Sequence, residues 1–161
     1  MAYEFYVTIE GTKQGKFKGD SKRRAHKDQI VGLAFDYEVG SLRDAASGQA
    51  TGKRQHKPVT ITKRWGAATP QLYQALITNE ILKSVLIEFM KTSPNGEEYV
   101  YHKIKLTNAA ITLIHQYANA DTREVEDVSF VFQKIEIENI DGKTSVTDDW
   151  SHPQAVSSVA T

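Results

Sequence analysis

Histidine and carboxylate side chains are the residues of this chain best suited to acid, base or metal chemistry. The five histidines, His26, His56, His102, His115 and His152, do not fall at the short spacings of zinc or metalloprotease motifs. Two of them, His102 and His115, lie in predicted strands, where an ordinary surface or core histidine is the more common role. The histidines therefore predict no metal site.

Neighbouring carboxylates occur at three places, and a general acid among them would need an apolar setting that raises its pKa. All three pairs lie in predicted turns or polar runs and are expected to be solvated: Glu97-Glu98, Glu126-Asp127 and Asp148-Asp149. The chain also lacks cysteine, a Gly-rich phosphate loop and a Gly-x-Ser-x-Gly turn. No residue pattern favours an enzyme or a cofactor, although a site assembled only by the fold remains open.

The composition of the 161-residue chain is that of a globular domain, with 40% hydrophobic and 25% charged residues. A long apolar run and a basic-then-apolar N-terminus are both missing, which predicts a cytoplasmic chain without a membrane span or cleaved signal. Residues 1–80 hold 13 Lys/Arg and 8 Asp/Glu, whereas residues 81–161 hold 7 and 12. This asymmetry indicates either solvated faces or a basic edge that meets an acidic edge on a second copy.

Residues 11–28 form a basic connection in which Phe17 is the only large apolar residue. Proteins that bind single-stranded nucleic acid usually combine a positive groove with several aromatic side chains. A solvated hairpin or a loose arm is therefore favoured over nucleic-acid binding. The basic residues of this segment are Lys13, Lys16, Lys18, Lys22, Arg23, Arg24 and Lys27.

Alternating apolar and polar residues predict strands near 3–9, 31–39, 59–65, 85–89, 98–106, 110–117 and 125–140. The last strand changes its apolar parity, which predicts a bulge or bend near Gln133. Thr69 as N-cap and Pro70 at the first helical position predict one short helix that ends near Asn79. The fold class is therefore mainly all-β, a closed or nearly closed antiparallel β-barrel or a sandwich.

Two further segments have no predicted strand or helix. Residues 40–57 form a long loop in which Leu42 is the only large aliphatic residue, and a compact domain seldom keeps such a loop without a use. The domain is expected to cover residues 1–145, followed by a polar and flexible C-terminal tail over residues 146–161.

Three segments resemble the Hcp family (haemolysin-coregulated proteins), the tube proteins of type VI secretion. The similarity extends over roughly residues 3–140. It is carried by residues 26–30 leading into Phe35-Asp36-Tyr37, by residues 52–63 followed by 68–76, and by residues 124–135.

The resemblance implies a β-barrel of two sheets with one helix, which assembles into hexameric rings that stack into a hollow tube. Its implied partners are further copies of itself, a VgrG-type spike protein, sheath and baseplate proteins, and effector cargo in the lumen. It implies no cofactor, no nucleic acid and no membrane insertion, and it implies export without a cleaved signal. Only about twenty residues follow Ile140, too few for a fused effector domain.

The family has an extended loop that reaches a neighbouring subunit, and residues 40–57 match its position. The resemblance therefore places Arg43, Asp44, Lys53, Arg54 and His56 at subunit contacts. The alternative for this segment is a disordered surface loop. The alternative for the protein is a stand-alone β-barrel binding module, either an effector chaperone or a nucleic-acid binder, while an envelope enzyme has no residue in its favour.

Overall fold

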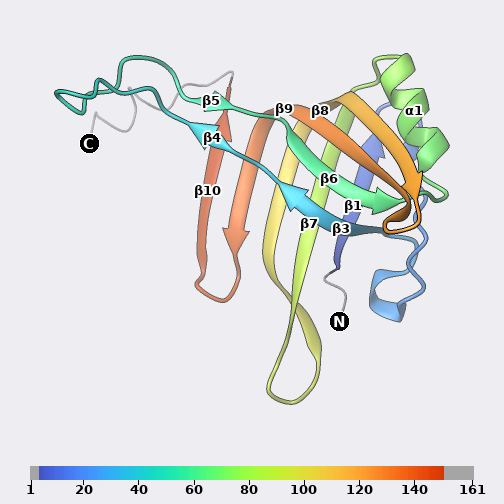
Figure 1. Cartoon of the computed structure of the whole chain (residues 1–161). Helices are drawn as coiled ribbons and strands as arrows, with labels where there is room; N and C mark the ends of the chain where they lie inside the picture. Colours follow the sequence, from blue (N-terminus) through green and yellow to red (C-terminus); the bar gives the residue numbers. More distant parts are fainter. Residues whose placement is uncertain (1–3, 151–161) are drawn as a thin grey trace.

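A computed structural model describes residues 4–150, and strands dominate it (Figure 1). Its elements in chain order are β1 (Phe5–Gly11), β2 (Gly15–Lys16), the 3-10 helix η1 (Arg24–His26), β3 (Ile30–Asp36), β4 (Val39–Gly40), β5 (Gln55–His56), β6 (Val59–Arg64), α1 (Thr69–Ile77), β7 (Leu82–Thr92), β8 (Glu98–Asn119), β9 (Arg123–Asn139) and β10 (Thr144–Asp149). Tyr3, in the first predicted strand, and His152 lie outside the described residues.

The strands close into an antiparallel barrel. Neighbours follow the order β9-β6-β3-β1-β7-β8, and β8 pairs with β9 to complete the ring. Strand β2 adds to β1, β10 adds to the second half of β9, and β4 and β5 form a separate ribbon that leaves the barrel (Figure 1). Within residues 4–150 there is one α-helix. The predicted antiparallel barrel with one short helix is confirmed.

The long strands β8 and β9 pair with each other and close the ring of strands. In these two strands the structure corrects predictions made from the sequence. The segments 98–106 and 110–117 belong to one strand, β8, whose register with β9 shifts between Ile111 and Leu113. The register of β9 with β8 is the same on both sides of Gln133, so the predicted bulge is absent there, and the alternative, a bend, stays a prediction. The parity changes between Phe132 and Ile135, where the second neighbour of β9 changes from β6 to β10.

The inward side chains of the strands form one core, in which aromatic rings of β1, β3 and β7 meet. The Phe5 ring lies 5.0 Å from Phe89 and 6.4 Å from Phe35, measured between centroids. Gly32 of β3 lies directly beneath Phe5, and a Cβ at that position would come within 2.1 Å of the ring. A glycine is therefore required there for β3 to approach β1.

Helix α1 packs Leu72 and Ala75 into the core at one end of the barrel (Figure 1). The predicted capping by Thr69 is wrong, because Ala68 occupies the N-cap and makes no side-chain hydrogen bond. Thr69 is instead the first helical residue, and its hydroxyl accepts a 3.0 Å hydrogen bond from the backbone N–H of Gly66.

The basic segment 11–28 is held in place by Phe17, His26 and the carboxylate of Glu80. It forms the β1–β2 hairpin and η1, with Phe17 buried and the His26 ring stacked 4.0 Å from Tyr6. The carboxylate of Glu80 accepts hydrogen bonds of 2.8 Å from the backbone N–H groups of Lys13 and Gln14. The seven Lys and Arg side chains remain exposed, as predicted, on a short hairpin rather than a loose arm.

The flexible tail predicted from residue 146 does not hold for residues 146–149. They belong to β10, in which Val146 pairs with Ile137 and Asp148 pairs with Ile135. Trp150 continues this pairing by donating its backbone N–H to the carbonyl of Gln133. Residues 151–161 lie outside the described part of the chain.

Candidate functional site

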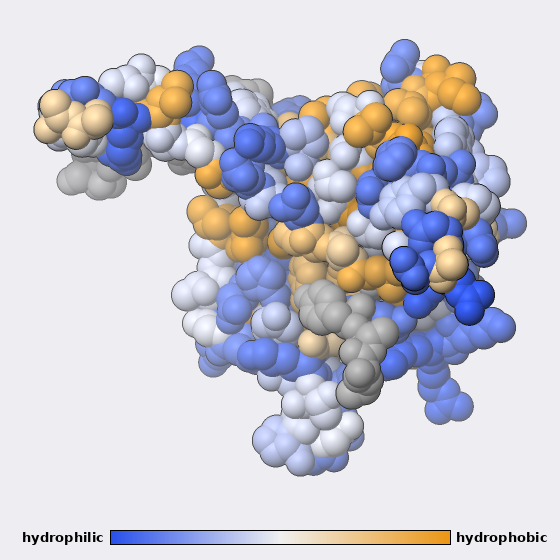
Figure 2. Space-filling model, viewed as in Figure 1, coloured by the Kyte–Doolittle hydropathy of each residue, from blue (hydrophilic) through white to orange (hydrophobic). Residues whose placement is uncertain are grey.

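The most prominent surface feature is a hairpin formed by residues 39–57, here called the arm. Its base is the β4–β5 ribbon, in which Val39 pairs with His56 and Gly40 with Gln55. Further out, Thr51 donates its N–H to the carbonyl of Leu42 at 2.9 Å. Figure 2 shows the arm protruding from the barrel, mostly hydrophilic with small hydrophobic patches. The arm is therefore an ordered projection and not a disordered loop.

The tip of the arm is stabilised by its own hydrogen bonds. The Asp44 carboxylate accepts hydrogen bonds from the N–H and hydroxyl of Ser47, which lower the pKa of Asp44 below its ordinary value. The Arg43 guanidinium donates to the carbonyl of Gly48 at 3.0 Å. Gly48 has φ +75°, a conformation in which a side chain would be strained. These contacts keep the tip folded without support from the barrel.

The base of the arm is tied to the barrel by one carboxylate on β10. Arg54 donates two hydrogen bonds of 2.5 Å to the two oxygens of Asp148, and Nε2 of His56 lies 2.6 Å from Oδ2. On its other side, Nδ1 of His56 lies 2.5 Å from the Tyr37 hydroxyl. The His56 side chain is only 5% exposed. Tyr37, Arg54, His56 and Asp148 are called the anchor below.

Hydrogen bonds, burial and charge within the anchor shift the pKa values of Asp148 and Tyr37. The hydrogen bonds from Arg54 lower the pKa of Asp148, burial opposes this effect, and His56 lowers the pKa further. Burial, and then the negative charge of Asp148, raise the pKa of Tyr37 to about 12. At neutral pH the anchor therefore combines a carboxylate, a guanidinium and an uncharged phenol.

The five arm residues selected from the sequence separate into three groups. Arg54 and His56 meet at the anchor, Arg43 and Asp44 stabilise the tip, and Lys53 is exposed on the returning segment. Sequence reasoning missed Tyr37 and Asp148 as partners of the arm. Tyr37 appeared in a predicted strand and in a segment that carries the family resemblance, without a contact to the arm, and Asp148 appeared only as half of an expected solvated pair.

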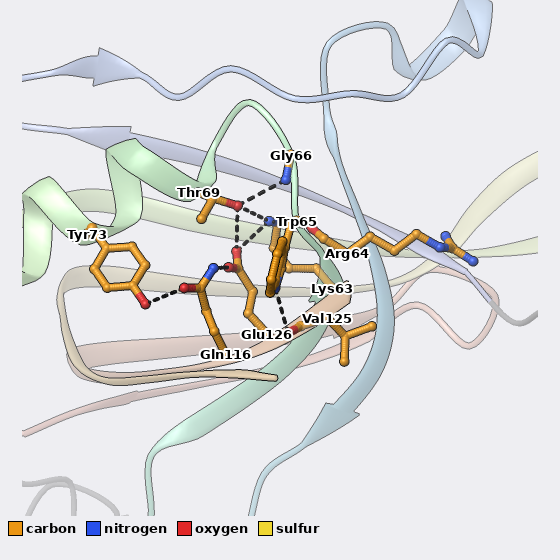
Figure 3. Close-up of polar contacts among 9 residues, drawn as sticks. All are labelled: Lys63, Arg64, Trp65, Gly66, Thr69, Tyr73, Gln116, Val125 and Glu126. Atoms are coloured by element: carbon orange, nitrogen blue, oxygen red, sulfur yellow. Dashed lines mark hydrogen bonds and ion pairs between the residues drawn. The ribbon is translucent and has the colours of Figure 1, made fainter. Parts of the chain in front are cut away.

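A second polar cluster lies under helix α1 and corrects another expectation. Glu126, expected to be solvated, is 0% exposed and accepts a 2.7 Å hydrogen bond from the ammonium group of Lys63 (Figure 3). The hydroxyl of Thr69 and the amide of Gln116 also donate to its carboxylate. Tyr73 donates to Gln116 at 2.7 Å, so this network joins α1 to strands β6, β8 and β9.

Two histidines outside these clusters also lie beside polar groups. His26 lies 2.6 Å from the Gln29 amide oxygen, while the side chain of His115 is 66% exposed and lies 3.9 Å from Asp127. Across residues 4–150, no group of three or more potential ligand side chains is arranged to hold a metal ion. None of the helices in the same range is long and apolar enough to cross a membrane.

Comparisons with known proteins agree with this architecture. The family model described as "Type VI secretion system effector, Hcp" matches residues 6–138. The chain is 37% identical to the "Major exported protein" of Pseudomonas aeruginosa, over 96% of this chain and 99% of that protein.

Solved structures give the same result at the level of the fold. A crystal structure of an Hcp protein has a TM-score of 0.86 at 31% identity, covering 92% of this chain and all of that one. The secreted protein Hcp3 from Pseudomonas aeruginosa has a TM-score of 0.75 at 33% identity, covering 92% and 99%. Because the family model spans most of the chain and the closed barrel is shared, this protein belongs to the Hcp family of type VI secretion.

Proposed function

We propose that the chain is a structural subunit of the type VI secretion inner tube. Six copies form a ring, rings stack head to tail into a hollow tube, and contraction of a surrounding sheath expels the tube with effectors in its lumen. The partners of the chain are then its own copies, a VgrG-type spike, sheath and baseplate proteins, and cargo. The chain itself performs no catalysis, and it is exported from the cell.

The ordered arm is the observation that carries this proposal. The arm projects from a closed barrel, and hydrogen bonds within its tip keep it folded. Such a hairpin is suited to contact another molecule. Val39 and Leu42 are 48% and 55% exposed, so the arm offers apolar area to a partner. A contact between two different surfaces of the same protein can produce both closed rings and open stacks.

The experiment is light scattering coupled to size-exclusion chromatography, followed by electron microscopy. A mass near six times 18.0 kDa and annular particles are expected. A variant in which Asn-Gly replaces residues 42–53 keeps the β4–β5 ribbon and Arg54. It is expected to fold as a barrel, by circular dichroism, and to lose ring closure or stacking.

Two outcomes would contradict the proposal. A strictly monomeric parent over a wide concentration range would favour a stand-alone binding module. Unchanged rings and tubes in the shortened variant would remove the arm from the mechanism. As a control, Gly48→Ala strains only the tip and is expected to weaken assembly less than complete removal of the arm.

A further inference from the structure

The direction of the arm must be set at its base. Residues 41–53 are exposed, and their backbone hydrogen bonds are made within the arm, for example from Thr51 to Leu42 and from Asp44 to Gln49. The ribbon at the base has only two residue pairs. A two-stranded ribbon of this length is not rigid on its own in water. Side-chain contacts at the base are therefore needed to fix how the arm leaves the barrel.

The anchor supplies these contacts through a single carboxylate. Arg54 and His56 are separated by one residue on an extended segment, so their side chains lie on the same side of the ribbon. Both reach Asp148, which faces them from β10, 94 residues later for Arg54 and 92 for His56. The guanidinium uses both Asp148 oxygens, and such a two-point contact restricts rotation as well as distance.

Aromatic side chains also pack against the base of the arm. The His56 ring lies 4.7 Å from Trp150 and 5.4 Å from Phe132, between centroids, and stacks 6.0 Å from Tyr37. Phe132 belongs to β9 and Trp150 follows β10, so the base of the arm packs on the β9–β10 hairpin. The polar and aromatic contacts hold the same ribbon against the same hairpin.

We propose that Asp148 of β10 is the positioning residue of the arm: it fixes the direction in which the arm meets a second copy of this chain. The effect of Asp148 on assembly rests on the proposed function. The position of the arm in a single chain is independent of that function. β10 thus takes part in assembly through a residue that lies outside the arm itself.

The first test measures the direction of the arm in isolated chains. The chain contains no cysteine, so Cys introduced at Ala46 and Asn95 gives two unique sites for spin labels, one near the arm tip and one in the β7–β8 turn. The parent is expected to give a narrow distribution of label distances. Asp148→Asn, which keeps the shape of the side chain but removes its charge, is expected to broaden that distribution at least about twofold.

Two variants keep this test interpretable. Asp121→Asn makes the same change at an exposed carboxylate in the β8–β9 turn and is expected to leave the distribution narrow. Arg54→Lys perturbs the anchor from the arm and is expected to broaden it, because an ammonium group cannot make the two-point contact. The thermal unfolding midpoint of each variant shows whether its barrel is intact. An unchanged distribution in both Asp148→Asn and Arg54→Lys would overturn the proposal.

The second test measures assembly of the unlabelled variants. The concentration at which half of the chains are in rings is expected to rise on the order of tenfold for Asp148→Asn, and Asp148→Glu is expected to recover part of the loss. A broad distribution with full assembly would also overturn the positioning role. If the parent forms no rings, the proposed function fails, whereas the distance measurements still decide whether Asp148 holds the arm.

Discussion

Lys63 and Glu126 place two opposite charges where almost no water reaches them. Their side chains are 1% and 0% exposed. Removing such charges from water costs several kcal/mol per ion, and the cost is offset only when further hydrogen bonds complete the site. Here Glu126 accepts from Lys63, Thr69 and Gln116, and Lys63 also donates to the carbonyl of Arg64. The network therefore depends on every member being present.

Glu126→Gln is expected to lower the free energy of unfolding by about 3–5 kcal/mol, because it leaves the Lys63 ammonium buried without its counter-charge. Urea denaturation measures this change. The double variant Lys63→Met with Glu126→Leu is expected to lose much less free energy of unfolding, because it removes both buried charges together. The matched control Glu124→Gln, at an exposed position of β9, is expected to change stability by less than about 0.5 kcal/mol. A single variant no worse than the double variant would contradict this explanation.

At the scale of elements, Glu80 connects the end of α1 to the β1–β2 turn. Burial alone would raise the pKa of Glu80, but hydrogen bonds from Gln14 and Lys13 outweigh it and hold the pKa below its ordinary value of 4.5. A carboxylate whose pKa is lower in the folded state stabilises the fold fully above its unfolded pKa. That contribution is lost as the pH falls below about 4.5 and through the folded pKa.

Glu80→Gln is accordingly expected to cost about 1.5–3 kcal/mol at pH 7 and clearly less at pH 3. Chemical denaturation of parent and variant at both pH values measures the difference. Glu97→Gln, in the exposed β7–β8 turn, serves as the control and should show no such dependence. A Glu80→Gln cost that is the same at pH 3 and pH 7 would show that the carboxylate charge is not what stabilises the turn.

The sequence predicts those elements whose signal is local. Alternation identifies β1, β3, β6 and β7 because each has one buried face, and helical spacing identifies α1. It fails for β8, where the parity of the buried residues changes between Leu106 and Ala109, around Asn108 with φ +51°, and one strand is read as two. It also fails for β10, whose residues are mostly exposed and belong to a strand only because β9 pairs with them.

The candidate site shows the same limit more clearly. Arg54 and His56 can be selected from the arm, and the resemblance supplies the reason. Their partner Asp148 cannot be selected from the sequence, because no residue near it in the chain indicates a contact with Arg54, 94 residues away. Glu126 is misread for the same reason: its neighbours in sequence are polar, while its burial is produced by Lys63 and the helix above it.

At the scale of the whole molecule, much of the excess positive charge in the first half of the sequence lies on the surface of segment 11–28. The seven basic residues of segment 11–28 are exposed, and Arg23 pairs with Glu98. Phe17, the one large apolar side chain of the segment, is 2% exposed and offers no face on which a base could stack. The segment therefore has the charge of a nucleic-acid site without its aromatic contacts.

The protein is expected to bind heparin weakly and to elute below about 0.2 M salt, without measurable affinity for single-stranded DNA at physiological salt. A heparin column and fluorescence anisotropy with a labelled oligonucleotide measure the two properties. Lys16→Gln with Lys18→Gln is expected to advance elution only slightly. Tight DNA binding that falls steeply with salt would favour the nucleic-acid alternative over an assembly role.

The order in which strands pair has a consequence for synthesis of the chain. Strand β6 lies between β3 and β9. The edge of β6 that faces β9 stays unpaired until β9 is synthesised, and Val128, the partner of Ile61 in β9, comes 67 residues later in the chain. A ribosome therefore releases more than half of the protein while a hydrophobic edge is still open. The ring of strands closes only when β9 has emerged, so each subunit completes its fold late in translation or after it.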